Sequence, residues 1–157
     1  MIPKRIVIDT NVCLDLFVFH DARWHMLLSA LKNGTVEAVT RADCRMEWLA
    51  VLEYRHLPLN DESRPVAVAS FDALIHCLEP STLTPRADIP LPVCSDRDDQ
   101  KFLELARDAS AHTLITKDKA LLKLAKRTAR AGLFNVVSPD RWMVEIQAVQ
   151  NAAAMPA

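Results

Sequence analysis

Glycine is scarce in this chain: only Gly34 and Gly132 occur among its 157 residues. The phosphate-binding loops of P-loop and dinucleotide-binding proteins each need several closely spaced glycines. Neither kind of loop can be built from this sequence. The scarcity of glycine therefore excludes those two classes of nucleotide-binding protein.

C-x-x-C pairs are also absent: the four cysteines are widely spaced, which argues against a zinc site of the usual spacing. Cys13, Cys44 and Cys77 lie in or beside apolar runs and are expected to be small buried hydrophobes. We expect a reduced, cytoplasmic protein. The N-terminal residues predict no secretory signal, and no apolar run is long enough to span a membrane.

The remaining composition is that of an ordinary globular protein, with 50% hydrophobic and 25% charged residues. The length predicts a single domain over residues 1–149, followed by a flexible tail over 150–157. The net charge of -1 excludes a chain that is basic as a whole. It does not exclude nucleic acid as a partner, because the local distribution of charge matters more than the sum.

Hydrophobic periodicity predicts strands that alternate with helices. Strands are expected at 5–8, 36–39, 113–116 and 134–137, and helices at 12–17, 22–32, 43–54, 65–77, 99–109, 119–131 and 139–148. Thr10 or Asn11 is the expected N-cap of the first helix, and the proline-rich segment 80–92 is an irregular connection. This order predicts an α/β fold with a mostly parallel sheet, whose working site lies beyond the carboxyl ends of the strands.

Four acidic residues stand beside these apolar segments, spread over most of the chain. They are Asp9 and Asp118, which follow strands, Glu47, inside a helix, and Asp99, at a helix start. Acids that follow parallel strands meet at one edge of the sheet, where they repel one another unless a cation lies between them. Taken singly, each has a structural role available: Asp9 as a helix cap, Asp99 as a first-turn acid, Glu47 as a solvated residue and Asp118 as a turn residue.

The segments that carry these acids resemble a PIN domain, of the branch described as toxins of bacterial toxin–antitoxin systems. The resemblance covers residues 5–142 and includes V-I-D-T-N-V at 7–12 and the helix around Glu47. Its more specific parts are D-x-x-D-x-x-F-L-E-L-A, which begins at Asp96, and I-T-K-D-x-x-L-L, which begins at Ile115. It implies a three-layer α/β sandwich with a central, mostly parallel sheet flanked by helices.

The resemblance also implies a ribonuclease that depends on Mg²⁺ or Mn²⁺ and cleaves single-stranded RNA. The implied catalytic and metal-binding acids are Asp9, Glu47, Asp99 and Asp118, with Asp96 as an additional or outer ligand. Asn11 and Thr116 match positions that support the site by hydrogen bonds, whereas Asp98 matches no site position and is expected to be exposed. These oxygen ligands suit Mg²⁺, and a bound divalent ion activates water and neutralises phosphate charge.

RNA also needs basic side chains along its backbone. Helical spacing places several basic residues on one face next to Asp118, and two arginines lie near Glu47; the candidates are Lys119, Lys123, Lys126, Arg127, Arg130, Arg41 and Arg45. A solvated helix face that happens to be basic is the equal alternative. The five histidines are expected to be structural or exposed. Packing is the expected role of Trp24, Trp48 and Trp142, although each could stack on a base.

Two other functions stay open from the sequence. One is a non-catalytic RNA-binding or regulatory module, although none of the four acids is missing. The other is a metal-dependent phosphatase that acts on small molecules. The expected partners are an RNA substrate and, through the resemblance alone, a small antitoxin protein. A homodimer is plausible, because the apolar residues near Trp24 and in segment 65–77 exceed what one sheet needs for cover.

Overall fold

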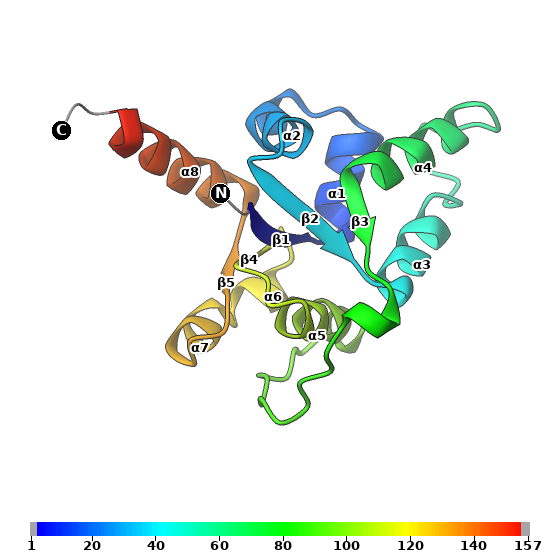
Figure 1. Ribbon diagram of the computed structural model, residues 1–157. Helices are drawn as coiled ribbons and strands as arrows, with labels where there is room; N and C mark the ends of the chain where they lie inside the picture. The colour runs from blue at the N-terminus through cyan, green and yellow to red at the C-terminus, as the bar shows by residue number, and fades with distance from the viewer. Residues whose placement is uncertain (1–2, 155–157) are drawn as a thin grey trace.

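The computed structural model describes residues 3–154, which form one parallel sheet between two layers of helices (Figure 1). The strand order is β3-β2-β1-β4-β5, and each neighbouring pair is parallel. The strands are β1 (Lys4–Ile8), β2 (Val36–Thr40), β3 (Ile75–Cys77), β4 (Thr113–Ile115) and β5 (Asn135–Val137). The predicted α/β class with a central parallel sheet is confirmed.

Helices and short 3-10 turns connect the strands. The helices are α1 (Thr10–Phe17), α2 (His25–Lys32), α3 (Ala42–Val51), α4 (Ser63–Leu74), α5 (Gln100–Asp108), α6 (Lys119–Leu122), α7 (Ala125–Arg130) and α8 (Pro139–Ala154). The 3-10 turns are η1 (Ala22–Trp24), η2 (Pro80–Thr82) and η3 (Arg97–Asp99). Among residues 3–154, no helix is both long and apolar enough to cross a membrane.

Strand β1 lies at the centre of the sheet and is apolar on both faces. Ile6 and Ile8 belong to the core under α1, α2 and α4, which Trp142 of α8 completes. Val7, whose side chain points the other way, belongs to the second core with Leu114 and the apolar side of α5. Helices on the two faces therefore exclude water from the second half of the central strand, Ile6, Val7 and Ile8 (Figure 1).

The segment predicted as one helix over 65–77 contains two elements. Helix α4 ends at Leu74, and Ile75–Cys77 forms β3 at the edge of the sheet, opposite Ala38–Thr40 of β2. The apolar run Ala73-Leu74-Ile75 suits a helix end and a short strand equally well, so its periodicity could not separate them. Pairing with β2 decides the outcome, and the prediction of a helix through Cys77 was wrong.

The helix predicted over 119–131 is also divided. Helix α6 ends at Leu122 and α7 begins at Ala125, with a tight turn in which the Leu124 amide donates to the Leu121 carbonyl over 2.9 Å. Leu121 and Leu124 are both buried in the second core. The tight turn at Lys123–Leu124 interrupts the α-helical hydrogen bonds, and the prediction of one continuous helix was wrong.

Smaller differences concern element ends. The first helix begins at Thr10 with Asp9 as its N-cap, instead of Thr10 or Asn11. Helix α3 ends at Val51, before the predicted end at 54. Helix α8 continues to Ala154, beyond the predicted end at 148, so residues 150–154 of the proposed tail are helical. Residues 155–157 of that tail lie outside the described residues.

Candidate functional site

Asp9 lies directly after β1 at the carboxyl edge of the sheet, and both of its carboxylate oxygens are hydrogen-bonded. Oδ1 accepts the Thr10 amide over 2.7 Å, and Oδ2 accepts the Thr116 hydroxyl over 2.6 Å. The side chain is only 4% exposed. Burial raises the pKa of Asp9 to about 6; the two hydrogen bonds oppose this rise, and the charges of Glu47 and Asp118 add to it.

Asp118 follows β4, the strand beside β1, and is the N-cap of α6. Its Oδ1 accepts the Ala120 amide over 2.7 Å. Its own amide donates to the Thr116 hydroxyl oxygen over 3.0 Å, the same hydroxyl that donates to Asp9. Thr116 is fully buried and joins the two strand ends that carry these acids. The other residue predicted to support the site, Asn11, has its side-chain Oδ1 buried without a hydrogen-bond partner among the described residues.

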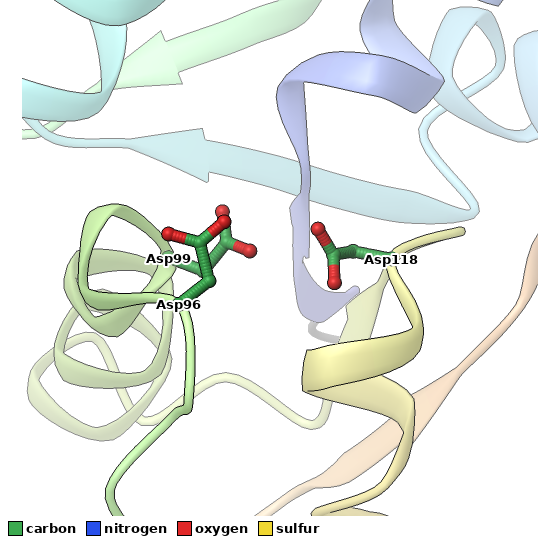
Figure 2. Close-up of side chains that lie close together, drawn as sticks. All are labelled: Asp96, Asp99 and Asp118. Carbon is green, nitrogen blue, oxygen red and sulfur yellow. The ribbon is translucent and has the colours of Figure 1, made fainter.

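Three carboxylates converge between η3 and α6. One oxygen from each of Asp96, Asp99 and Asp118 lies within 4.8 Å of the others. In Figure 2, Asp96 and Asp99 project from the turn before α5, and Asp118 faces them from the start of α6. Asp96 caps η3 by accepting the Asp98 amide over 3.1 Å, and this turn places Asp96 and Asp99 together. Asp98 is exposed, as predicted.

Asp99 has the most unusual environment of the three. Its side chain is 8% exposed, and its Oδ2 is buried with no hydrogen-bond partner among the described residues. Burial is the largest cause that raises the pKa of Asp99 well above its ordinary value, followed by its hydrogen bond with Asp118 and by the charge of Asp9. A buried carboxylate oxygen with no donor is costly, and a cation beside it would remove that cost.

Glu47 does not share this convergence of oxygens. It projects from α3, where its Oε2 accepts the Thr10 hydroxyl and its Oε1 lies 2.9 Å from Lys101 Nζ. The amide of Thr10 also donates to Asp9, the N-cap of α1, and the charge of Glu47 contributes to the raised pKa of Asp9. Glu47 is therefore linked to the site through Thr10 and Lys101, and both of its own oxygens are already engaged.

Lys101 was missed by the sequence analysis. It lies in α5, two residues after Asp99, inside the motif that carries the resemblance. The signal that could have revealed it is charge: the acids around one site need a compensating cation, and Lys101 is a basic residue of that motif that lies on α5 itself. Its side chain is 20% exposed.

A second ion pair holds the loop between β4 and α6. Lys117 Nζ lies 2.7 Å from Asp15 Oδ2, and the same oxygen accepts the indole Nε1 of Trp24 over 2.9 Å. Asp15 is buried on α1, and Lys117 stands between Thr116 and Asp118. Helix α1 therefore anchors the loop that presents Asp118.

The basic candidates for RNA binding fall into two groups. The first is exposed on α6, α7 and the turns beside them, and within residues 3–154 none of its members has a carboxylate at ion-pair distance: Lys119, Lys123, Lys126, Arg127 and Arg130. In the second group, Arg41 pairs with Asp43 and Glu104, and Arg45 pairs with Asp72. A shallow hollow beside α7, lined by Lys126 and Arg141, adjoins the first group.

The tryptophan and histidine side chains are not members of the convergent acidic cluster. Trp24, Trp48 and Trp142 are buried in the core, as their predicted packing role requires. All five histidines are exposed: His20, His25, His56, His76 and His112.

The residues of the convergent cluster fit a hard divalent cation. The cluster offers only carboxylate oxygens, which Mg²⁺ and Mn²⁺ accept, and no nitrogen or sulfur ligand. The partnerless, buried Oδ2 of Asp99 is the observation that favours a cation over a merely solvated group of acids. Three carboxylates leave positions for water and for phosphate oxygens around such an ion.

Comparison with known proteins supports the predicted resemblance. No curated protein matches the chain. Among solved structures, a similar chain is that in the crystal structure of VapBC2 from Rickettsia felis bound to a DNA fragment from their promoter. That chain shares 13% identity and a TM-score of 0.56, over 85% of this chain and 98% of its own length. At this identity the likeness shows the fold. The family model described as the PIN domain matches residues 5–120, from β1 into α6, and the chain therefore belongs to the PIN domain family.

Proposed function

We propose that this chain is a ribonuclease that depends on Mg²⁺ or Mn²⁺ and hydrolyses phosphodiester bonds of single-stranded RNA. The observation that carries the proposal is the convergence of one carboxylate oxygen each from Asp96, Asp99 and Asp118, to which Asp99 adds a buried oxygen without a hydrogen-bond partner among the described residues. PIN domains are in general nucleases, and the family assignment favours this chemistry over other uses of an acidic cluster.

The proposed site contains two sets of acids, the metal ligands and the acids that lie beside them. Asp96, Asp99 and Asp118 hold the ion, and Asp9 and Glu47 lie beside them and complete the negative field of the site. When bound, a divalent ion lowers the pKa of an attacking water and neutralises charge on the phosphate. Thr116 keeps Asp9 and Asp118 in register, because its hydroxyl contacts both segments.

The exposed basic side chains of α6 and α7 are the proposed path of the RNA backbone. The first of these residues follows Asp118 directly in the chain. None of the set has a carboxylate partner among the described residues: Lys119, Lys123, Lys126 and Arg127. Free cations of this kind attract phosphates without reading the base sequence. Arg41 and Arg45 are weaker candidates, because carboxylates already neutralise both.

The biological setting that we propose is a bacterial toxin–antitoxin pair, in a cytoplasm, with a small antitoxin protein as the partner. The support is the resemblance of the motifs and the VapBC2 structure among the similar folds. Whether the chain also forms a homodimer would be measured by light scattering at several protein concentrations.

The test is cleavage of an end-labelled single-stranded RNA with Mg²⁺ or Mn²⁺, with and without EDTA. Asp99→Asn removes the central carboxylate charge, and Asp98→Asn makes the same chemical change at the exposed neighbour. We expect the wild type and Asp98→Asn to cut, and Asp99→Asn to lose at least 100-fold in rate.

Other outcomes would point to the rival functions. Equal cutting by Asp99→Asn would refute the proposed site. Hydrolysis of a chromogenic phosphate monoester without any cutting of RNA would support a phosphatase. Metal-independent RNA binding without cleavage would support a binding module.

A further inference from the structure

Lys101 is the basic side chain that contacts the acidic site directly. Its Nζ lies 2.9 Å from Glu47 Oε1 and also donates to the backbone carbonyl of Asp98. The same ammonium lies 5.4 Å from the centre of the Phe102 ring. Within residues 3–154, no other basic side chain is at ion-pair distance from Asp9, Glu47, Asp96, Asp99 or Asp118. Lys101 is thus held in place by several partners at one border of the site.

The five acids differ in what already satisfies them. Asp9 accepts hydrogen bonds on both oxygens, from Thr10 and Thr116. Glu47 is engaged on both oxygens too, by the Thr10 hydroxyl and by Lys101. Asp99 keeps one buried oxygen with no partner. The acids that lack a compensating positive charge are therefore Asp96, Asp99 and Asp118. The negative charge of Glu47 is already compensated by the ammonium of Lys101.

We propose that the site takes one divalent ion, at Asp96, Asp99 and Asp118, and that Lys101 supplies the second positive charge of the site, at Glu47. This inference rests on the proposed function and deepens it. A second divalent ion at Glu47 would meet the ammonium of Lys101, and like charges a few ångströms apart repel strongly in a partly buried site. The ammonium of Lys101 thus limits the site to one divalent ion.

The test is a titration of the purified protein with Mn²⁺ alone, in which electron paramagnetic resonance measures the free ion. Lys101→Gln removes the charge and keeps much of the side chain, and Lys101→Arg keeps the charge. Lys32→Gln is the matched control. Lys32 is exposed at the end of α2, shortly before the start of β2, and so lies near the amino ends of the strands, whereas the acidic site lies at their carboxyl ends. Circular dichroism melting checks that each variant folds.

We expect one Mn²⁺ per chain for the wild type, Lys101→Arg and Lys32→Gln. Lys101→Gln should bind a second ion, with an affinity for that ion at least tenfold higher than in the wild type. Two tightly bound ions in the wild type, or a single ion in a folded Lys101→Gln protein, would overturn the inference.

A second variant keeps the inference testable if Lys101→Gln does not fold. Glu47→Gln removes the partner of Lys101, and it should still bind one ion with an affinity within about threefold of the wild type. A loss of tenfold or more would make Glu47 a ligand of that ion and would contradict the assignment.

The failure of the ribonuclease proposal would look different. One ion in the wild type and two in Lys101→Gln, with RNA left intact by both, would reject the ribonuclease and retain the role of Lys101. If the wild type and Lys101→Gln each bind one ion and RNA is cleaved, the ribonuclease is retained and the role of Lys101 is rejected. A wild type that binds no Mn²⁺ would reject both.

Discussion

Thr116 donates its hydroxyl to Asp9 Oδ2 over 2.6 Å and thereby ties the end of β4 to the end of β1. The two residues are 107 positions apart in the sequence. The oxygen of the same hydroxyl accepts the amide of Asp118 over 3.0 Å. One buried threonine therefore satisfies polar groups of two segments that carry acids of the candidate site.

Replacing Thr116 by valine should destabilise the protein. The change leaves Asp9 Oδ2 and the Asp118 amide without their partner, and an unsatisfied buried polar group costs about 1–3 kcal/mol. Urea unfolding followed by circular dichroism would measure the loss. Thr116→Ser keeps the hydroxyl and should recover most of the stability. Thr84→Val, at an exposed position of the connection before α5, should change it by less than about 0.5 kcal/mol.

The stability of the metal-free protein should fall as the pH rises from 5 to 8. Burial raises the pKa of Asp9 to about 6 and that of Asp99 further, from ordinary values near 4. The folded state therefore binds more protons than the unfolded state above about pH 4, and the free energy of unfolding decreases as these protons leave. Urea unfolding in EDTA at several pH values would show a loss on the order of 1–3 kcal/mol.

Two variants separate this effect from other titrations. Asp99→Asn should flatten the decrease, because its amide has no proton to lose, and Asp98→Asn should leave it unchanged. Saturating Mn²⁺ should reverse the loss at pH 8, since an ion that binds only the folded state stabilises it. A decrease of the same size in Asp99→Asn would mean that other groups cause it.

Removing the Asp15 carboxylate should destabilise the protein by more than the loss of one ion pair, because Asp15 contacts both Lys117 and Trp24. Asp15→Ala removes the acceptor of the Trp24 indole as well as the partner of Lys117. We expect a loss of about 1.5–3 kcal/mol, the range for a buried hydrogen bond to a charged group. Asp88→Ala, at an exposed position, is the control. Equal melting temperatures for the two variants would contradict this role.

Removing charge from α7 should weaken RNA binding without changing the metal site. Lys126→Ala combined with Arg127→Ala takes away two exposed cations, and the salt dependence of binding should become shallower by about one to two units of slope. Fluorescence anisotropy with a labelled RNA in EDTA would measure both quantities. The control is Lys32→Ala combined with Arg55→Ala, which removes the same charge elsewhere on the surface. Identical salt slopes for the two double variants would remove α7 from the RNA path.

The sequence was a good guide to the strands next to the site and a poor guide to contacts between helices. Asp9 directly follows one apolar strand and Asp118 follows another after two residues, so parallel pairing predicts that they meet at one edge. Strand β3 was missed because its three residues, Ile75–Cys77, are too few to show a period of their own, and its pairing with β2 is a tertiary contact. Lys101 was missed for a similar reason: its partner, Glu47, is 54 residues away on another helix.

The strand order has a consequence for synthesis on the ribosome. Strand β1 precedes its neighbour β4 by more than 100 residues in the chain, so one side of β1 has no partner strand until β4 has been made. Asp118 can face Asp96 and Asp99 only after β4 has paired with β1. A nascent chain that ends before Asp118 therefore lacks the assembled acidic cluster, and only the synthesis of β4 and Asp118 allows the three carboxylates to come together.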